Sequence, residues 1–502
     1  MSTAYWIYSR LERSAGKFLT FKDLRIILSN LTGLFAVTAI LLAAMAVLCV
    51  VFNELENVPA FLAAFTVSGG IALLLKLMFP AAGSTELRHA MIVAAIAYIA
   101  VPAVSMIPFI NIEHMTIIDA YFEAISGWTG TGFSMIMEPE HSSKTILLWR
   151  SVTQWIGGIG VLLLMVTILI RPGTSTYAMY KSEAHKERIH PSIQSTIKTI
   201  WLTYFALTVL GVALLVAVGM PVWDSINHGL VAIGNGGFSI YSDSIMHYNS
   251  IPVEIVIMFL MFLGALPFAY VYKAAKNPKN VLSVDPEVKT FLALILAGIF
   301  FVTLELYYSR RDLFESFRLA AFQFLSAVTS GGFQTSMMTD WSLSAMIILS
   351  IGMCIGGCAG STAGGIKVAR AIFLVSDFKL WIKRTMLPGN VIVTIKMGNR
   401  RVNEEAISKE LAEAGLISFL WIVTILLSVI LLSHFVDQSY GLDQVVFTVC
   451  SAQSNSGIWC GLIDPGMHYA GKLVLIFDMW IGRLEIIPVV LFLRYLIRGF
   501  SL

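Results

Sequence analysis

Charged residues are scarce in this chain. They make up 13% of its 502 residues, against about 25% in an ordinary soluble protein, whereas hydrophobic residues make up 57%. The five cysteines show neither the spacing of a zinc site nor that of a disulfide framework. The first residues are polar and basic without an apolar core, so we expect no cleavable secretory signal. This composition excludes an ordinary soluble protein and favours a polytopic helical membrane protein.

Ten apolar stretches are long enough to cross a bilayer, which takes about 20 helical residues. Two come first, at Ser29–Phe52 and Pro59–Phe79. Four pairs follow, and they are His89–Ile110 with Ile146–Ile170, Ile197–Met220 with Ile251–Tyr272, Thr290–Tyr308 with Ser342–Val375, and Leu411–Phe435 with Gly471–Phe500. We therefore predict an all-α membrane protein with two extra N-terminal helices and four parallel helix–pore-helix–helix repeats around one central pore.

This division assigns a span of the chain to each unit. The N-terminal segment and the two extra helices take residues 1–85, and the four repeats take 86–190, 191–285, 286–400 and 401–502. Inverted-repeat carriers are disfavoured because the four repeats all have the same orientation.

Between the members of each pair, a short helix-like segment ends in a strip rich in Gly, Ser and Thr. The four strips read TGTGF, GNGGF, TSGGF and SNSGI. The glycine before the last residue of each strip is common to all four, and these glycines lie about a hundred residues apart. The candidate residues are Thr129, Gly130, Thr131, Gly132; Gly234, Asn235, Gly236, Gly237; Thr329, Ser330, Gly331, Gly332; and Ser454, Asn455, Ser456, Gly457.

The chemistry of these strips suits a monovalent cation. Non-helical backbone at membrane depth persists only inside protein or along a water-filled cavity. Glycine reaches positive φ without steric cost, so successive carbonyls can turn toward one axis. The strips contain no Asp or Glu, and rings of neutral carbonyls replace the hydration shell of K⁺. We predict a K⁺ selectivity filter made of the four strips, with K⁺ as the transported ion. The alternative is close packing of helices at the glycines.

An acidic residue is expected near the start of each short pore helix, where it favours the helix dipole. Asp119 and Asp224 lie 13 residues before their strip glycine, and Asp443 lies 14 before Gly457. In the third repeat the nearest acid is Glu315, 17 residues before its glycine. These acids are interpreted chiefly as capping residues. Glu123, inside the first pore helix, is interpreted as a structural hydrogen-bonding partner.

Basic residues alternate with the predicted repeats. They gather before the first helix, in the joins between repeats and at the tail, and include Lys181, Lys186, Arg188, Lys273, Lys276, Lys379, Lys383, Arg384, Arg400, Arg401, Arg494 and Arg498. The positive-inside bias then places both termini and every join in the cytoplasm, and all four strips enter from outside. Arg150 lies near the outer end of its stretch, where snorkelling to the surface is expected.

Several motifs resemble the Trk/Ktr/HKT potassium-transporter superfamily, and the two extra helices resemble its TrkH/TrkG branch. The motifs are FEAISGWTGTGF (122–133), LLWRSVTQWIGGIG (147–160), GNGGFS (234–239), TSGGF, IGGCAGSTAGGIK (355–367) and GRLEI (482–486). The chain departs from the family pattern at Gly130, at Asn235 and along SNSGI, and these departures bear on how strongly Na⁺ is excluded.

The resemblance implies partners and a location. They are a homodimer with one pore per protomer, a cytoplasmic TrkA-type nucleotide-binding regulatory ring, and a multi-pass place in the cell inner membrane among its lipids. A regulatory nucleotide, NAD or ATP/ADP, would bind to that ring. No organic cofactor in this chain and no nucleic-acid partner are expected.

The resemblance also implies a gate below the filter. The predicted gate residues are Gly356, Gly357, Gly360, Ser361, Thr362, Gly364, Gly365, Lys367 and Arg483. Five glycines disfavour a straight helix at about 1 kcal/mol each, so a kink for packing is the alternative for the loop. An arginine in an apolar span needs a cavity or partner. For Arg483 the alternative is a salt bridge to Glu485 or another acid.

The sequence bears on three possible functions. The first is K⁺ uptake through a gated pore, and the second is K⁺ symport coupled to Na⁺ or H⁺, which the strips alone do not separate from the first. The third, a membrane-embedded enzyme, is not expected, because the sequence shows no metal-ligand cluster or nucleophile–base pair and its histidines are scattered singly.

Overall fold

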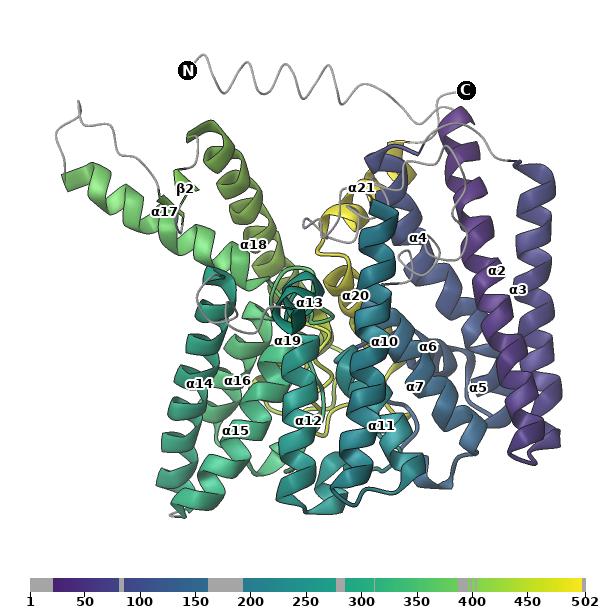
Figure 1. The fold of residues 1–502 in the computed structure, drawn as a ribbon, viewed down its shortest axis with the longest axis horizontal. Helices are drawn as coiled ribbons and strands as arrows, with labels where there is room; N and C mark the ends of the chain where they lie inside the picture. The colour runs from purple at the N-terminus through teal and green to yellow at the C-terminus, as the bar shows by residue number, and fades with distance from the viewer. Residues whose placement is uncertain are drawn as a thin grey trace.

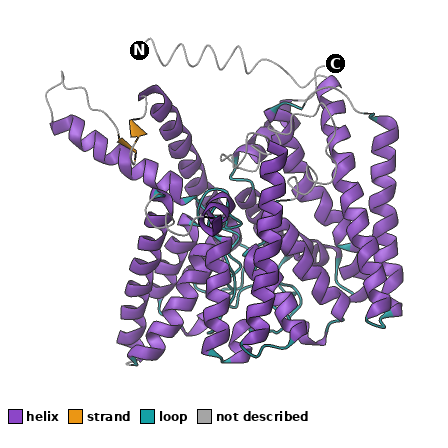
Figure 2. Ribbon diagram, viewed as in Figure 1, coloured by secondary structure: helices purple, strands orange, loops and turns teal. Residues whose placement is uncertain are grey.

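The part of the chain that the structure describes is predominantly helical. The computed structural model describes residues 21–80, 85–160, 193–276, 285–310, 312–386, 396–397, 400–401 and 404–498. Helices dominate, and loops gather toward the middle of the molecule (Figure 2). In these residues the strands are β1 (Lys396–Met397) and β2 (Arg400–Arg401), which pair antiparallel. The all-α prediction is confirmed; the short hairpin was not expected.

Six helical segments in the described residues are long and apolar enough to cross a membrane. They fall in α2 (Phe21–Val51), α3 (Val58–Met78) with the turn before it, α4 (Leu87–Ser105) with α5 (Ile107–Ile112), α10 (Ile193–Ala217), α14 (Pro286–Arg310) and α18 (Glu404–Ser433). A bent pair, α12 (Ile251–Gly264) and α13 (Phe268–Lys276), makes a seventh if it is counted as one span. Large apolar side chains such as Leu77, Phe205, Phe300 and Phe419 are exposed on these helices, as expected of surfaces that face lipid.

A pore helix lies between two apolar elements in each of the four repeats. The pore helices are α6 (Ile117–Thr129), α11 (Val222–Gly234), α15 (Leu313–Thr329) and α19 (Leu442–Gln453). The elements that follow them are α7 (Lys144–Ile159), α12, α16 (Leu343–Ile355) and α20 (Tyr469–Arg483). Helices α2 and α3 pack side by side at one edge, outside the repeats (Figure 1). The order of elements follows the predicted organisation.

Two predicted spans are broken rather than straight. The stretch Ile251–Tyr272 bends by 107° between α12 and α13. Pro267 lies in the break and accounts for it, because proline lacks an N–H donor and disfavours helical geometry in the residue before it. The stretch Gly471–Phe500 divides into α20 and α21 (Ile487–Arg498), with positive φ at Glu485 and Ile486.

The interruption predicted in the third repeat is present. Helix α16 ends at Ile355, a loop follows, and α17 (Val368–Met386) begins after it. Helix α17 projects away from the bundle beside the start of α18 (Figure 1). In the first repeat α7 is described only to Gly160, so the remainder of the predicted span Ile146–Ile170, and the basic residues Lys181, Lys186 and Arg188, lie outside the described residues.

Candidate functional site: four strips and the loop against them

The four strip glycines form a closed ring of contacts. A Cβ built on Gly132 would lie 3.0 Å from the Cα of Gly237, and one built on Gly237 would lie 2.8 Å from the Cα of Gly332. A Cβ on Gly332 would lie 2.5 Å from the carbonyl oxygen of Ser456, and one on Gly457 would lie 3.0 Å from the Cα of Gly132. Each glycine therefore abuts the next strip, and no side chain fits between them.

The backbone conformation repeats from strip to strip. All four ring glycines have positive φ, from 72° at Gly457 to 98° at Gly132. The residue in the second position of each strip is also left-handed, and these residues are Gly130 (67°), Asn235 (50°), Ser330 (57°) and Asn455 (53°). The carbonyl oxygen of the third residue in each strip lies against the ring glycine of a neighbouring strip, where an added Cβ would meet it. These carbonyls belong to Thr131, Gly236, Gly331 and Ser456.

The acids at the pore-helix starts are where the sequence predicted them in three repeats. Asp119, Asp224 and Asp443 lie in the first turns of α6, α11 and α19, but the N-cap residues of these helices are Thr116, Pro221 and Gly441. The three acids therefore have the expected position without being the capping residues. In the third repeat the capping residue is Asp312, which accepts from the backbone N–H groups of Phe314 and Glu315. Glu315 was expected in this role, but α15 has 17 residues against 12 or 13 in the others, which moves its N-cap back by one turn.

On one side, the ring borders a cavity of about 240 Å³. All four ring glycines line it together with Arg150, Tyr241, Asp243 and Gln334. At its rim, Glu140 accepts from the backbone N–H (3.0 Å) and hydroxyl (2.9 Å) of Ser242. Burial raises the pKa of Glu140, but hydrogen bonds from its own backbone and from Ser242, with the charge of His141, together lower it by more, so the pKa lies below its ordinary value. The carboxylate therefore stays charged at neutral pH and holds the rim segment.

On the other side, the predicted gate loop touches the strips. The backbone N–H of Gly364 donates to the hydroxyl of Ser330 (3.1 Å), and this hydroxyl donates to the Ser454 carbonyl (3.1 Å). The Thr362 hydroxyl and the Asn235 amide are hydrogen-bonded at 3.0 Å. The loop therefore contacts the side chains of Ser330 and Asn235, the second residues of their strips. The strips lie between the loop and the cavity that Tyr241 lines.

The loop folds on itself and against α12. Gly356, Gly360 and Gly365 have positive φ, and a Cβ on Gly365 would lie 2.8 Å from the Cα of Gly356. The backbone N–H groups of Cys358 and Thr362 donate to the carbonyls of Ala265 and Gly264, both at 3.1 Å. The α12 carbonyls that the break at Pro267 leaves free are thus satisfied by the loop.

Arg483 lies against the loop. Its guanidinium donates to the carbonyl of Thr362 (2.9 Å), to the carbonyls of Gly157 and Gly158 on α7, and, at 3.5 Å, to the hydroxyl of Tyr98 on α4. Glu485, the acid named as an alternative partner, pairs with Arg370 on α17. The predicted gate loop and Arg483 are therefore brought together.

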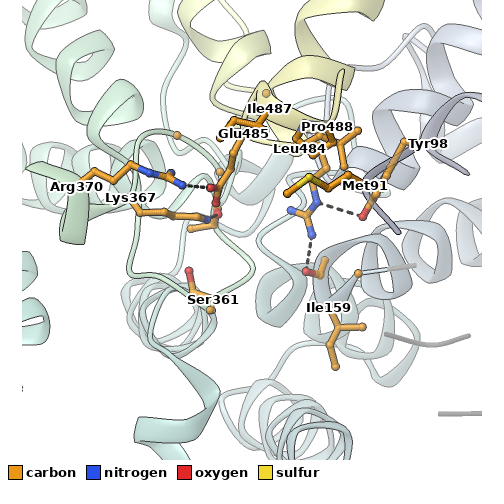
Figure 3. A pocket seen from close by; sticks show the side chains of 18 of the residues that line it. Met91, Tyr98, Ile159, Ser361, Lys367, Arg370, Leu484, Glu485, Ile487 and Pro488 are labelled. Atoms are coloured by element: carbon orange, nitrogen blue, oxygen red, sulfur yellow. Dashed lines mark hydrogen bonds and ion pairs between the residues drawn. The ribbon is translucent and has the colours of Figure 1, made fainter. Parts of the chain in front are cut away.

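These groups line a second cavity of about 120 Å³. Figure 3 shows Lys367, Arg370 and Ser361 on one side of it and Tyr98 and Met91 on the other. Lys367 is buried and donates to the carbonyl of Ala363 within the loop. The wall of this cavity thus carries three basic side chains, Lys367, Arg370 and Arg483, and Arg370 is neutralised by Glu485.

Arg150 does not snorkel to the surface as expected. It is 2% exposed, and its Nε donates to Glu123 at 2.7 Å. Its other nitrogens reach the Ser239 carbonyl (2.9 Å) and the Ser134 hydroxyl (2.8 Å). The carboxyl of Glu123 also accepts from the backbone N–H of Met135 at 2.7 Å, so its interpretation as a structural hydrogen-bonding partner agrees with the geometry.

Two glutamines that contact the strips were missed. The Gln154 amide donates to the Gly236 carbonyl and accepts from the Phe238 N–H (3.0 Å). Gln334 pairs likewise with Trp459, donating to its carbonyl (3.0 Å) and accepting from its N–H (3.1 Å). The available signal for Gln154 was a polar residue in an otherwise apolar helix.

This arrangement defines a class of protein: a helical membrane protein in which four re-entrant pore helices direct Gly-rich strips to one ring between two cavities. Residues 59–498 match the family model TrkH, described as a cation transport protein. The chain therefore belongs to the TrkH family.

Several relatives cover most of the chain. An uncharacterised cation transporter of Methanocaldococcus jannaschii is 31% identical over 94% of this chain and 95% of its own. The Trk system potassium uptake protein TrkH of Salmonella typhimurium is 31% identical over 80% of this chain and 84% of its own. The crystal structure of the potassium transporter TrkH from Vibrio parahaemolyticus matches with a TM-score of 0.78 and 25% identity, over 94% of this chain and 98% of that one. The chain is thus a Trk-type transporter in fold and sequence.

Proposed function

We propose that this chain takes up K⁺ through a gated, channel-like pore whose selectivity filter is the four strips. The observation that carries the proposal is the ring of Gly132, Gly237, Gly332 and Gly457 between two cavities. Backbone carbonyls are the only oxygen ligands that all four strips share, and neutral carbonyls favour a monovalent cation. The relatives named as potassium uptake proteins support K⁺ as the ion.

The gate in this proposal is the loop Gly356–Gly365 together with Lys367 and Arg483. The loop contacts two of the four second-position residues, Asn235 through Thr362 and Ser330 through the N–H of Gly364. Ser330 in turn donates to the carbonyl of Ser454 in the fourth strip. Arg483 places a positive charge beside the loop, where a cation leaving the filter would pass. Glycines at positive φ give the loop more than one accessible conformation.

Regulation and assembly complete the proposal. The chain would form a homodimer in the cell inner membrane, with both termini cytoplasmic, above a TrkA-type ring that binds NAD or ATP/ADP. Lys379 and Lys383 lie on the exposed half of α17, which projects from the bundle and offers a basic surface (Figure 1). K⁺ symport coupled to Na⁺ or H⁺ remains the second candidate, since a carbonyl ring serves either mechanism.

The deciding experiment is tracer uptake into liposomes that hold the purified protein. We expect faster uptake of Rb⁺ than of Na⁺, with reversal potentials that follow the K⁺ gradient alone. A reversal potential that shifts with the Na⁺ or H⁺ gradient would establish coupling instead. Equal Rb⁺ and Na⁺ uptake would contradict the filter assignment.

A further inference from the structure

A buried polar side chain occupies the same position in every pore helix, nine residues before the ring glycine. These side chains are Glu123, His228, Gln323 and Thr448. Each is at most 1% exposed. The residue types differ, being a carboxyl, an imidazole, an amide and a hydroxyl, so the sequence shows no common motif. What they share is that each needs a buried partner, because an unpaired polar group at this depth costs free energy.

Each finds that partner two or three residues beyond the ring glycine of its own strip. Glu123 accepts from the Met135 N–H at 2.7 Å, and His228 Nε2 contacts the Ser239 hydroxyl at 3.1 Å. The same contact recurs in the other two repeats. Gln323 Oε1 accepts from the Thr335 N–H at 3.2 Å, and the Thr448 hydroxyl contacts the Cys460 thiol at 3.2 Å.

The geometry gives these contacts a mechanical role. The strip leaves the end of the pore helix, passes the ring glycine and turns back alongside the helix. A bond from the helix to the returning segment closes this turn, so the position of the ring glycine is fixed from both sides. None of the four side chains lines either of the two cavities, so among the described residues they act from behind the strips.

We propose that Glu123, His228, Gln323 and Thr448 are four braces, positioning residues that set the filter geometry and thereby its preference for K⁺ over Na⁺. This rests on the proposed function. The braces differ in strength because their chemistry differs. Glu123 is tied through Arg150 to Ser239 and so links the first two strips. Among the described residues, the partner of Thr448 is a thiol, a weak hydrogen-bonding group, so this brace is the weakest of the four.

The test compares three variants of the full chain in liposomes. Gln323→Met keeps the size of the side chain but removes the acceptor, whereas Gln323→Glu keeps an oxygen facing the Thr335 N–H. Ser316→Ala is the matched control, since Ser316 is buried in the same helix and its hydroxyl has no hydrogen-bond partner among the residues that the structure describes. Should Gln323→Met fail to fold, His228→Phe with His228→Gln as its rescue provides the same comparison.

We expect the Rb⁺/Na⁺ flux ratio to fall about two- to tenfold in Gln323→Met, the range given by the loss of one hydrogen bond. The ratio should return toward the parent value in Gln323→Glu and stay unchanged in Ser316→Ala. A merely structural residue would lower both fluxes together and leave the ratio alone. If the unsubstituted protein prefers Rb⁺ to Na⁺ and Gln323→Met keeps the same flux ratio, the braces are overturned but the proposed function stands. If the unsubstituted protein shows no preference for Rb⁺, both proposals are contradicted.

Discussion

At the scale of single residues, the fourth position of each strip tolerates no side chain. A Cβ on any of the four ring glycines meets the backbone of the next strip, and φ is positive at all of them. Substitution therefore moves two strips at once. The second position differs: it is also left-handed, yet Ser330 occupies it in the third strip and nothing lies within 4 Å of a Cβ on Gly130.

This contrast gives a matched pair of substitutions. Gly132→Ser, Gly237→Ser, Gly332→Ser and Gly457→Ser should each lower the Rb⁺/Na⁺ flux ratio, because the added atoms displace carbonyls of the neighbouring strip. Gly130→Ser, in the same first strip, should change the ratio far less. Tracer fluxes in liposomes measure both. If all four ring variants kept the Rb⁺/Na⁺ flux ratio of the unsubstituted protein, the filter assignment would be ruled out.

Arg483 could slow K⁺ through its charge or through its hydrogen bonds to the loop, and two substitutions separate these two effects. At about 5 Å and an effective dielectric of about 20, two unit charges of like sign repel by about 3 kcal/mol, which slows passage about a hundredfold if it all enters the barrier. Arg483→Ala should raise K⁺ flux with little change in ion preference. Arg483→Lys keeps the charge without the fork of donors and should conduct nearly as the parent does. A Lys variant as fast as the Ala variant would assign the barrier to the hydrogen bonds.

At the scale of elements, the proposed gate is the loop Gly356–Gly365, which is held against the strips by hydrogen bonds to Ser330 and Asn235. Deleting Ala359–Gly364 removes the contacts to Ser330 and Asn235 but leaves the ring glycines untouched. We expect K⁺ flux to rise while the Rb⁺/Na⁺ ratio stays near that of the parent. Thr362→Val, which removes the side-chain bond to Asn235 without shortening the loop, serves as the control. A normally expressed deletion variant with parental flux would show that the gate lies elsewhere.

The sequence predicted where the apolar helices lie better than it predicted which of them are broken. The ten apolar stretches and the four strips were recognisable because length and glycine recurrence are properties of the chain itself. The break after α12 had a signal in Pro267, and α21 carries Pro488 in its first turn, a favourable place for proline. The pairing of Arg150 with Glu123 within the first repeat, and that of Glu485 with Arg370 between two repeats, had no such signal. The spacing of charged residues along the chain does not specify which side chains meet once the helices pack.

At the scale of the whole molecule, the basic residues of α17 and of the hairpin β1–β2 lead to a prediction about partners. Reversing the charge at Lys383, Arg384, Arg400 and Arg401 should weaken binding of a nucleotide-binding ring, since these residues lie on or beside α17 and the hairpin β1–β2. Co-purification and light scattering measure the complex. Lys144→Glu, on the opposite side of the predicted membrane, is the control. Undiminished binding in the fourfold variant would move the docking surface away from α17.

The closure of the ring has a consequence for biosynthesis. Gly457 closes the ring against Gly132, and the same seam is joined by Asn455 with Thr131 and by Lys472 with Asp119. None of these contacts can form until the fourth repeat has left the ribosome. A nascent chain with three repeats therefore holds polar strip backbone at membrane depth with one side uncovered. We expect the first three repeats to wait in the translocon or with a membrane chaperone, and chains truncated before Leu442 to be degraded rather than to conduct unselectively.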